Sequence, residues 1–221
     1  STLMGKLRER GWDGFLTRYW MPGDLSPAAY YLSRAAWDST VTPRAAHDDL
    51  LTAMCGPGVA ERVIHGFDLV EKATGIIDIN DIGFTFPVPG MLMKHYTADP
   101  VPAWWKEVRD LYSAAGNEMY RGNHRSVVTG RPFLLYNAKR LEFAGSYLTA
   151  VEEVRLAGIA KAAGKRDEQK SHLEKAVEAL YGALSAQGEV VRDPSDRGVI
   201  AALTEHAYRP LQKELEKLEK Q

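Results

Sequence analysis

The chain has 221 residues, 45% of them hydrophobic and 26% charged, so it can bury a sizeable core and is neither disordered nor fibrous. Its 28 basic and 29 acidic residues give a formal net charge of -1, which provides no overall basic field to neutralise phosphates and argues against a nucleic-acid partner. No run reaches the ~18 apolar residues of a membrane span, and the first residues lack the apolar stretch of a signal peptide, so we expect a soluble chain with no membrane partner.

The chain has one cysteine, which excludes an intramolecular disulfide and assigns no cellular compartment. Cys55 stands at the end of a helical pattern, in the run Met-Cys-Gly. In that position we expect a small buried thiol rather than a nucleophile.

The N-terminal residues predict a helix followed by a strand. Residues 2–10 have basic side chains before Gly11, as at the end of a helix. Residues 12–20 are rich in aromatic and β-prone side chains and precede the turn Met21-Pro22-Gly23, which predicts the one strand of the chain. A lone strand leaves its backbone groups unpaired, so it requires a partner. It could also pair with a second copy of the chain, as a homodimer through residues 12–20.

Start signals and apolar periodicity predict that the rest is an antiparallel bundle of about six to seven helices. The first helix follows Ser26-Pro27 and runs from Ala28 to Trp37 with its aromatic and small residues on the buried side. The second begins at Thr42-Pro43 and ends near Met54. The third runs from Val59 to Thr74 and ends at Gly75.

The second half of the chain contains a predicted loop and longer helices. Residues 76–101 have prolines and glycines without a sustained period, which predicts a long ordered loop. A helix is predicted over 102–121 and is ended by Gly122-Asn123. Two further helices are predicted over 132–163 and 167–187, and these two are expected to pack antiparallel to each other. A last helix begins at Asp193-Pro194-Ser195 and is interrupted near Arg209-Pro210. Its end, 213–220, is expected to be a solvated face rather than a coiled coil.

Motifs that would carry chemistry are missing from the sequence. There is no Glu-x-x-His pair of a di-metal bundle, no glycine-rich phosphate loop and no Gly-x-Ser-x-Gly elbow. The scattered histidines exclude a zinc site of the Cys/His type. His47 with Asp48 and Asp49, and His65 with Asp68, occur at helical spacing, but on faces that need polar residues in any case. We expect no cofactor, no metal and no catalytic residue on this chain.

The most informative stretch is residues 18–25, at the end of the predicted strand. It contains a guanidinium, two aromatic rings and a carboxylate in Arg18, Tyr19, Trp20 and Asp24. A sugar ring offers an apolar face to an aromatic plane and hydroxyls to charged groups, so this mixture suits a carbohydrate pocket. In the other interpretation, Tyr19 and Trp20 belong to the core and Asp24 is a cap or turn residue.

Several phrases resemble a known group of enzymes. They are Tyr19-Trp20-x-x-Gly23-Asp24-Leu25-Ser26-Pro27, Tyr30-Tyr31-Leu32-Ser33-Arg34-Ala35-Ala36-Trp37-Asp38 and Val41-Thr42-Pro43. Together they resemble the junction in bacterial glycoside hydrolases, of the hexosaminidase-like and glucuronidase-like group, where the last barrel strand passes into a C-terminal helical domain. Residues 130–134, 140–144, 195–200 and 208–211 are similar to phrases of the same helical region.

The resemblance implies that residues 1–25 are the end of a (β/α)8 barrel and residues 26–221 an α-helical domain. It places the catalytic pair of carboxylates on barrel strands outside this chain. The chain alone would then be inactive, with a catalytic barrel from the same parent chain or another chain as its partner, unless the helical domain has come to work without a barrel. Arg18, Tyr19, Trp20 and Asp24 would edge the carbohydrate pocket without serving as acid or nucleophile.

Three residues near the start of the long helix are secondary candidates. Arg131, Asn137 and Arg140 could reach toward a barrel mouth, or could simply form salt bridges and caps. The leading hypothesis is therefore a helical domain of a glycoside hydrolase, and it predicts exposed apolar surface around Phe15, Leu16, Tyr19 and Trp20. A non-enzymatic helical protein-interaction module predicts that the strand is covered or absent, and a free-standing small-molecule binding bundle predicts a closed internal pocket.

Overall fold

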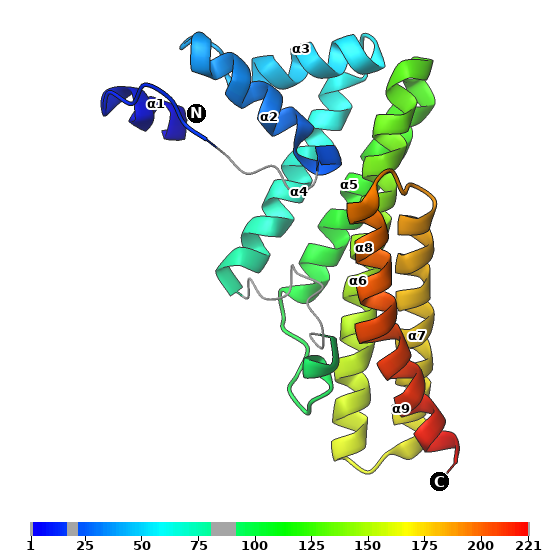
Figure 1. Ribbon diagram of the computed structural model, residues 1–221. Coiled ribbons are helices and arrows are strands. Elements are labelled where there is room, and N and C mark those ends of the chain that lie inside the picture. Colours follow the sequence, from blue (N-terminus) through cyan, green and yellow to red (C-terminus); the bar gives the residue numbers. More distant parts are fainter. Residues whose placement is uncertain (1, 17–21, 81–91, 221) are drawn as a thin grey trace. The chain divides into compact units, whose positions relative to one another are not determined.

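The computed structural model describes residues 2–16, 22–80 and 92–220, and these residues are mainly helical (Figure 1). The α-helices, in chain order, are α1 (Thr2–Glu9), α2 (Pro22–Trp37), α3 (Pro43–Cys55), α4 (Ala60–Asn80), α5 (Trp105–Arg125), α6 (Arg131–Ala162), α7 (Arg166–Gly188), α8 (Pro194–Leu203) and α9 (Arg209–Glu219). The predicted mainly α fold is confirmed, with no strand in the described parts of the chain.

The helices form two compact units. Unit 1 comprises Ser1–Asp68 and Asn117–Asn137, and unit 2 comprises Leu69–Gly116 and Ala138–Gln221. The predicted boundary between 1–25 and 26–221 concerns the origin of the first segment, and it stays a prediction.

The N-terminal helix is confirmed, and the strand after it is not shown. α1 ends at Glu9, and Gly11 takes the positive φ of +67° that favours glycine. Residues 12–16, the described part of the predicted strand, have no regular secondary structure, and residues 17–20 lie outside the described residues. A strand is held by its neighbours, and the described residues offer none to pair with.

Two helix boundaries in unit 1 show how local signals succeed and fail. α3 starts as predicted, because the Thr42 side chain accepts a hydrogen bond from the Ala45 amide at 3.2 Å, and it ends where Gly56 adopts φ +89°. The predicted start after Ser26-Pro27 is wrong, because α2 begins at Pro22 and contains Pro27. One proline removes a single helical hydrogen bond, and the 16-residue helix retains the others.

Two glycines that were expected to end helices lie inside them. α4 continues past Gly75 to Asn80, and this extension carries Ile77 into the core of unit 2. α5 continues past Gly122, where a Cβ atom would lie 3.3 Å from Cγ2 of Val63. A glycine inside a helix costs only about 1 kcal/mol. The burial of Ile77 outweighs this cost in α4, and the close packing of Gly122 against Val63 outweighs it in α5.

Unit 2 is built on the antiparallel pair α6 and α7, as the sequence predicts (Figure 1). The buried face of α7 repeats at intervals of three and four residues, through Leu173, Ala176, Leu180 and Ala183. It packs into a core with the α6 residues Leu148, Val151, Val154 and Ala157. α8 and α9 lie beside α7 in the same unit.

The predicted loop 76–101 is shorter than expected, because its first residues belong to α4. Its described end contains the 3-10 turn Leu92–His95, and residues 81–91 lie outside the described residues. Arg155 of α6 donates from Nε to Nδ1 of the buried His95 at 3.3 Å, and from an Nη atom to the Pro100 carbonyl at 3.0 Å. These contacts fasten the segment to α6.

The C-terminal helix changes its winding where the sequence predicts an interruption. A π-helical turn, Thr204–Tyr208, joins α8 to α9 directly before Pro210, which cannot donate a backbone hydrogen bond. In α9, Leu211 is fully buried, while Leu215 and Leu218 pack partly against the unit 2 core. The expected solvated face is therefore only the charged side of this helix.

Across the described residues, every helix is too short or too polar to cross a bilayer.

The close approach of Thr97 to α6 gives the first prediction. A Cβ atom added at Gly158 would overlap the Thr97 backbone, lying 2.6 Å from its nitrogen, whereas one added at Gly145 of the same helix would meet nothing within 4 Å. Gly158→Ala should cost about 1–3 kcal/mol of unfolding free energy. Gly145→Ala should be neutral or stabilise by up to about 1 kcal/mol. Urea denaturation of both variants checks this, and equal midpoints would contradict the packing described.

Candidate functional site

The four principal site residues of the sequence analysis fall at the margin of the described structure. Arg18, Tyr19 and Trp20 lie outside the described residues. Asp24 lies in the first turn of α2, and its side chain is not among those described. Their assignment to a carbohydrate pocket therefore stays a prediction.

Two of the secondary candidates make local backbone contacts in unit 1. Arg131 donates from Nε to the Ser126 carbonyl at 3.3 Å. Asn137 is buried and donates from Nδ2 to the Phe133 carbonyl at 2.8 Å, one turn back in α6. Both contacts are local to the start of α6, and neither is the salt bridge or the cap of the alternative interpretation. The assignment of these residues to a barrel mouth stays a prediction.

The third secondary candidate belongs to a polar network in unit 2. Arg140 donates to Oε1 of Gln187 at 2.8 Å, and the Gln187 amide donates to Oδ1 of Asp196 at 2.8 Å. Gln187 is fully buried, and Asp196 is nearly so. The second carboxylate oxygen of Asp196 accepts the Arg192 amide at 2.9 Å. This network ties α6 and α7 to the start of α8.

Part of the resembling phrase Tyr30–Asp38 has a clear structural role. Tyr30 donates from its hydroxyl to Oδ2 of Asp49 at 2.6 Å, and Arg34 donates to the same oxygen at 2.7 Å. These hydrogen bonds, the Tyr30 bond foremost, lower the pKa of the Asp49 carboxyl below its usual value. Tyr30 and Arg34 therefore join α2 to α3, and are not offered to a ligand.

Trp37, in the same phrase, does not pack where the sequence predicts. It was expected on the buried side of its helix, yet it is 94% exposed. The buried residue of that turn is Ala35, whose carbonyl accepts a hydrogen bond from Arg8 of α1. Because α1 reaches α2 through the Ala35 side, the Trp37 ring is left in the solvent.

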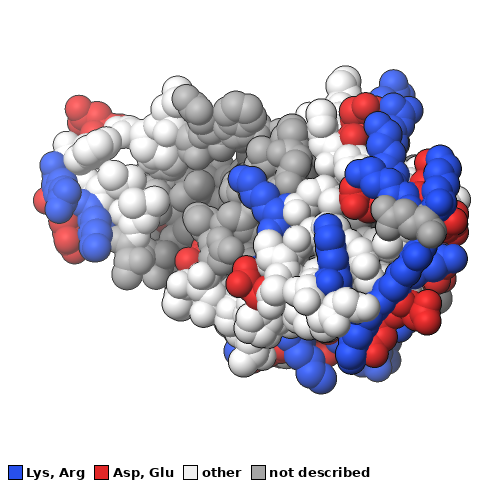
Figure 2. All heavy atoms as spheres, turned by 90° about the horizontal axis from the view of Figure 1, so that it is seen from below, with Lys and Arg blue, Asp and Glu red and all other residues white. Residues whose placement is uncertain are grey.

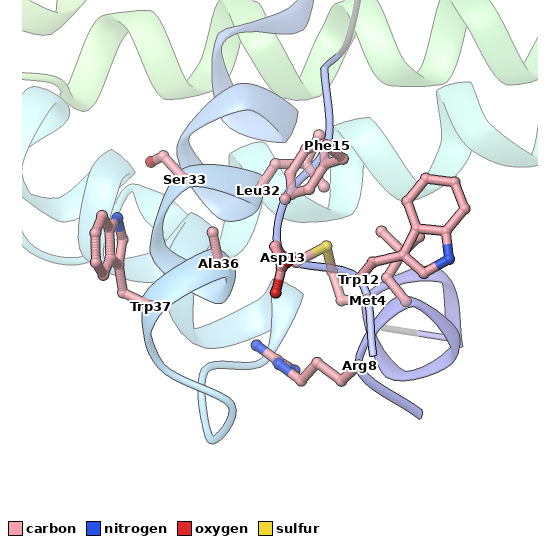
Figure 3. Close-up of a pocket in the computed structure, with 11 residues that line it drawn as sticks. Met4, Arg8, Trp12, Asp13, Phe15, Leu32, Ser33, Ala36 and Trp37 are labelled. Atoms are coloured by element: carbon pink, nitrogen blue, oxygen red, sulfur yellow. The ribbon is translucent and has the colours of Figure 1, made fainter. Parts of the chain in front are cut away.

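An aromatic cavity of about 350 Å³ lies in unit 1 between α2 and the N-terminal segment (Figure 3). The rings and polar groups that line it include Arg8, Trp12, Asp13, Phe15, Ser33 and Trp37. Figure 3 shows Trp37 on one side and Trp12 on the other, with Asp13 and Arg8 between them. We refer to it as the α1–α2 cavity. Its lining combines aromatic and aliphatic side chains with a guanidinium, a carboxylate and a hydroxyl.

The sequence analysis missed this cavity, although its residue types carried a signal. Trp12 was placed in a strand and Trp37 on a buried helix face, 25 positions apart in the chain. Only the fold of α1 against α2 brings them to one cavity. The sequence offered two signals for the cavity: Trp12 directly follows the helix-ending Gly11, and Trp37 stands at the end of its helix.

A second, polar cleft of about 500 Å³ in unit 1 includes His65 and Asp68. Its arginines and carboxylates are largely paired, with Arg62 2.6 Å from Glu118 as its closest ion pair. No group of three or more His, Cys, Asp or Glu side chains in the described parts of the chain could hold a metal ion. The cleft offers a mixed-charge surface rather than a metal centre.

Buried reactive side chains do not form a nucleophilic site. Cys55 is fully buried, as expected, and burial raises the pKa of its thiol. Burial also raises the pKa of Tyr147 to about 12, so its phenol stays protonated at neutral pH. Neither group is prepared to act as a nucleophile.

Surface charge does not add another candidate. Figure 2 shows Lys and Arg side chains interspersed with Asp and Glu on the face that it draws. Several basic side chains near the ends of α6, α7 and α9 are paired, such as Lys165 with Glu168 at 3.0 Å and Lys170 with Glu219 at 3.4 Å. The face drawn therefore lacks the single-signed charge typical of a phosphate-binding surface.

Comparisons with known proteins found no match to this chain among family models, curated protein sequences or solved structures.

The unit 2 network gives the second prediction. Asp196→Ala would leave the buried Gln187 amide and the Arg192 N–H without their acceptor, which should cost about 2 kcal/mol or more of unfolding free energy. Ser195→Ala is the matched control in the same turn, because Ser195 is exposed, and it should change stability by less than about 0.5 kcal/mol. Guanidinium unfolding measures both. A tolerated Asp196→Ala would show that the network does not hold α8.

Proposed function

We propose that this chain is the C-terminal helical domain of a carbohydrate-active glycoside hydrolase, which packs on a catalytic barrel and edges its sugar pocket without being catalytic alone. The observation that carries the proposal is the exposed apolar surface of the N-terminal segment. Leu3 is 61% and Leu16 94% exposed, and Phe15 is also accessible. The leading hypothesis from the sequence predicts exposure at Phe15 and Leu16.

Energetics favour a covered state for this segment. Single exposed apolar side chains are common on protein surfaces, but Leu3, Phe15 and Leu16, within fourteen residues, form a concentrated apolar segment. Fully burying one leucine side chain is worth about 1.5–3 kcal/mol. A partner that covers Leu3, Phe15 and Leu16 would therefore gain appreciable binding free energy.

The barrel proposal also accounts for the irregular backbone of residues 12–16. The predicted strand over 12–20 would acquire backbone hydrogen bonds only when a neighbouring barrel strand pairs with it. Arg18, Tyr19, Trp20 and Asp24 would then lie at the carboxyl end of that strand, where barrel enzymes bind ligands. The catalytic carboxylates would come from the barrel.

The alternative is a non-enzymatic helical interaction module, which predicts that the strand is covered or absent. The irregular backbone of residues 12–16 agrees with that expectation. An exposed turn elsewhere in unit 1 also favours this alternative. Val127 and Val128, in the turn before α6, are both exposed. That turn is fixed, because the Val127 amide donates to the Cys55 carbonyl at 3.0 Å. A rigid turn that displays two valines could be recognised by a partner protein.

Paired charge substitutions test the proposal. The longer protein encoded by this chain with its upstream sequence should hydrolyse at least one member of a panel of aryl glycosides that includes N-acetylhexosaminides and glucuronides, while this chain alone should not. Leu16→Asp in the longer protein should lower that activity or its Tm, because it places a charge in the docking surface. The same change should leave the Tm of this chain alone unaltered, since Leu16 is already solvated.

Val128→Asp is the control, because it alters another largely exposed apolar residue of unit 1, and it should leave the hydrolysis unchanged. A longer protein without a barrel and without hydrolysis would overturn the proposal and favour the interaction module. Self-association that Leu16→Asp abolishes, without any hydrolysis, would instead identify a homodimer through the N-terminal segment.

A further inference from the structure

Two tryptophans of the α1–α2 cavity are exposed without a structural reason. Trp37 is 94% and Trp12 60% exposed, so neither contributes much to the core of unit 1. Neither ring stacks on another aromatic ring or receives a cation among the described residues, in contrast to the Trp104–Trp105 pair, whose ring centroids are 5.3 Å apart. An indole that makes no core contact is available to an incoming apolar face.

Polar groups of the same cavity are also available. The Asp13 carboxylate makes no hydrogen bond or ion pair within the described residues. Arg8 donates one guanidinium N–H to the Ala35 carbonyl, and its guanidinium has five N–H donors in total. Ser33 donates its hydroxyl to the Tyr30 carbonyl, which leaves the Ser33 oxygen as an acceptor. The cavity thus offers acceptors and a donor between two indoles (Figure 3).

We propose that the α1–α2 cavity binds a saccharide ring, as a site separate from the predicted pocket at residues 18–24. The axial C–H groups of a pyranose present an apolar face that stacks on an indole, here Trp37 or Trp12. Its ring hydroxyls donate to the Asp13 carboxylate and accept from the Arg8 guanidinium. The volume of about 350 Å³ lies at the small end of the range for ligand pockets, which suits one or two sugar rings.

Other ligand classes fit the cavity less well. A nucleotide would need several cations for its phosphates, and the lining has Arg8 alone, beside the negative Asp13. A lipid chain would need an enclosed apolar lining, whereas this cavity contains Arg8, Asp13 and Ser33. The exposed indoles, with one guanidinium and one carboxylate beside them, match a ligand that has both apolar faces and several hydroxyls.

The inference deepens the proposed function, and it rests on that function only for the choice of sugars to test. A saccharide held on α2 would be a subsite of the helical domain. Binding to this site is a property of the present chain, so it can be measured without any barrel.

The test is a titration of this chain with N,N′,N″-triacetylchitotriose and with glucuronic acid, followed by tryptophan fluorescence and by calorimetry. We expect saturable binding of at least one sugar in the millimolar range. Trp37→Ala should weaken it about five- to tenfold, as expected for the loss of one stacking contact. Asp13→Asn, which keeps the shape and removes the charge, should weaken it by a smaller factor.

Tyr181→Ala is the matched control, because Tyr181 is an aromatic residue of unit 2 that is 61% exposed, and it should leave binding unchanged. Trp37→Ala should fold normally, since the ring is almost fully solvated, and circular dichroism with the Tm checks this. No saturable binding up to 10 millimolar of either sugar, or binding that Trp37→Ala leaves intact, would overturn the inference.

The two proposals fail separately. Hydrolysis by the longer protein without sugar binding by this chain would retain the proposed function and overturn the α1–α2 cavity as a saccharide site. Trp37-dependent sugar binding without hydrolysis would retain the site and overturn the glycoside hydrolase assignment. An apolar dye that binds at Trp37 while neither sugar does would mark the cavity as a protein-docking surface, which also overturns the inference.

Discussion

The antiparallel contact between α6 and α7 is the constraint on which unit 2 depends. Glu153 of α6 lies 2.7 Å from His172 of α7, and Arg140 of α6 donates a hydrogen bond to Gln187 of α7. Residue numbers therefore increase along α6 in the direction in which they decrease along α7. Between these polar contacts the two helices bury aliphatic and alanine side chains. Since each large aliphatic side chain contributes about 1.5–3 kcal/mol, this seam supplies much of the stability that orders the segments packed against it, including α8, α9 and the 92–100 loop.

The sequence predicts elements well where a local signal agrees with burial. α3 has its threonine cap and closing glycine, and α6 and α7 have long apolar periods, so their bounds came within one or two residues of the structure. The failures are of another kind. Gly75 and Gly122 are local stop signals that tertiary packing overrides, and the residues near them could be judged only once Ile77 and Val63 had neighbours. A strand needs a partner strand, and single-strand propensity at residues 12–16 could not supply one.

The sequence predicted a carbohydrate-suited mixture of rings and charges at Arg18, Tyr19, Trp20 and Asp24, and that prediction stays untested because it falls on residues or side chains that the structure does not describe. The described cavity, with Trp12, Asp13 and Trp37, is a different site that the sequence analysis did not predict. The contribution of α2 could not be foreseen, because helical periodicity assigned Trp37 to the buried side. The periodicity was misleading there because the buried residue of the last turn of α2 is the small Ala35, and not the aromatic Trp37.

The two units differ in whether their polar groups are paired within the described structure. In unit 2, the buried Asp196 and Gln187 satisfy one another, and a network of that kind rigidifies the helices it joins. In unit 1, the exposed indoles and Asp13, which has no partner among the described residues, lie on α2 and on a short N-terminal segment with few buried side chains. Segments with few buried contacts open and adjust at low free-energy cost, and recognition surfaces are drawn from them. The apolar leucines and the α1–α2 cavity occur together on such a segment, so a docked partner that fixed residues 3–16 would also fix the cavity beside them. Sugar affinity and partner docking would then be coupled through the ordering of one short stretch of chain.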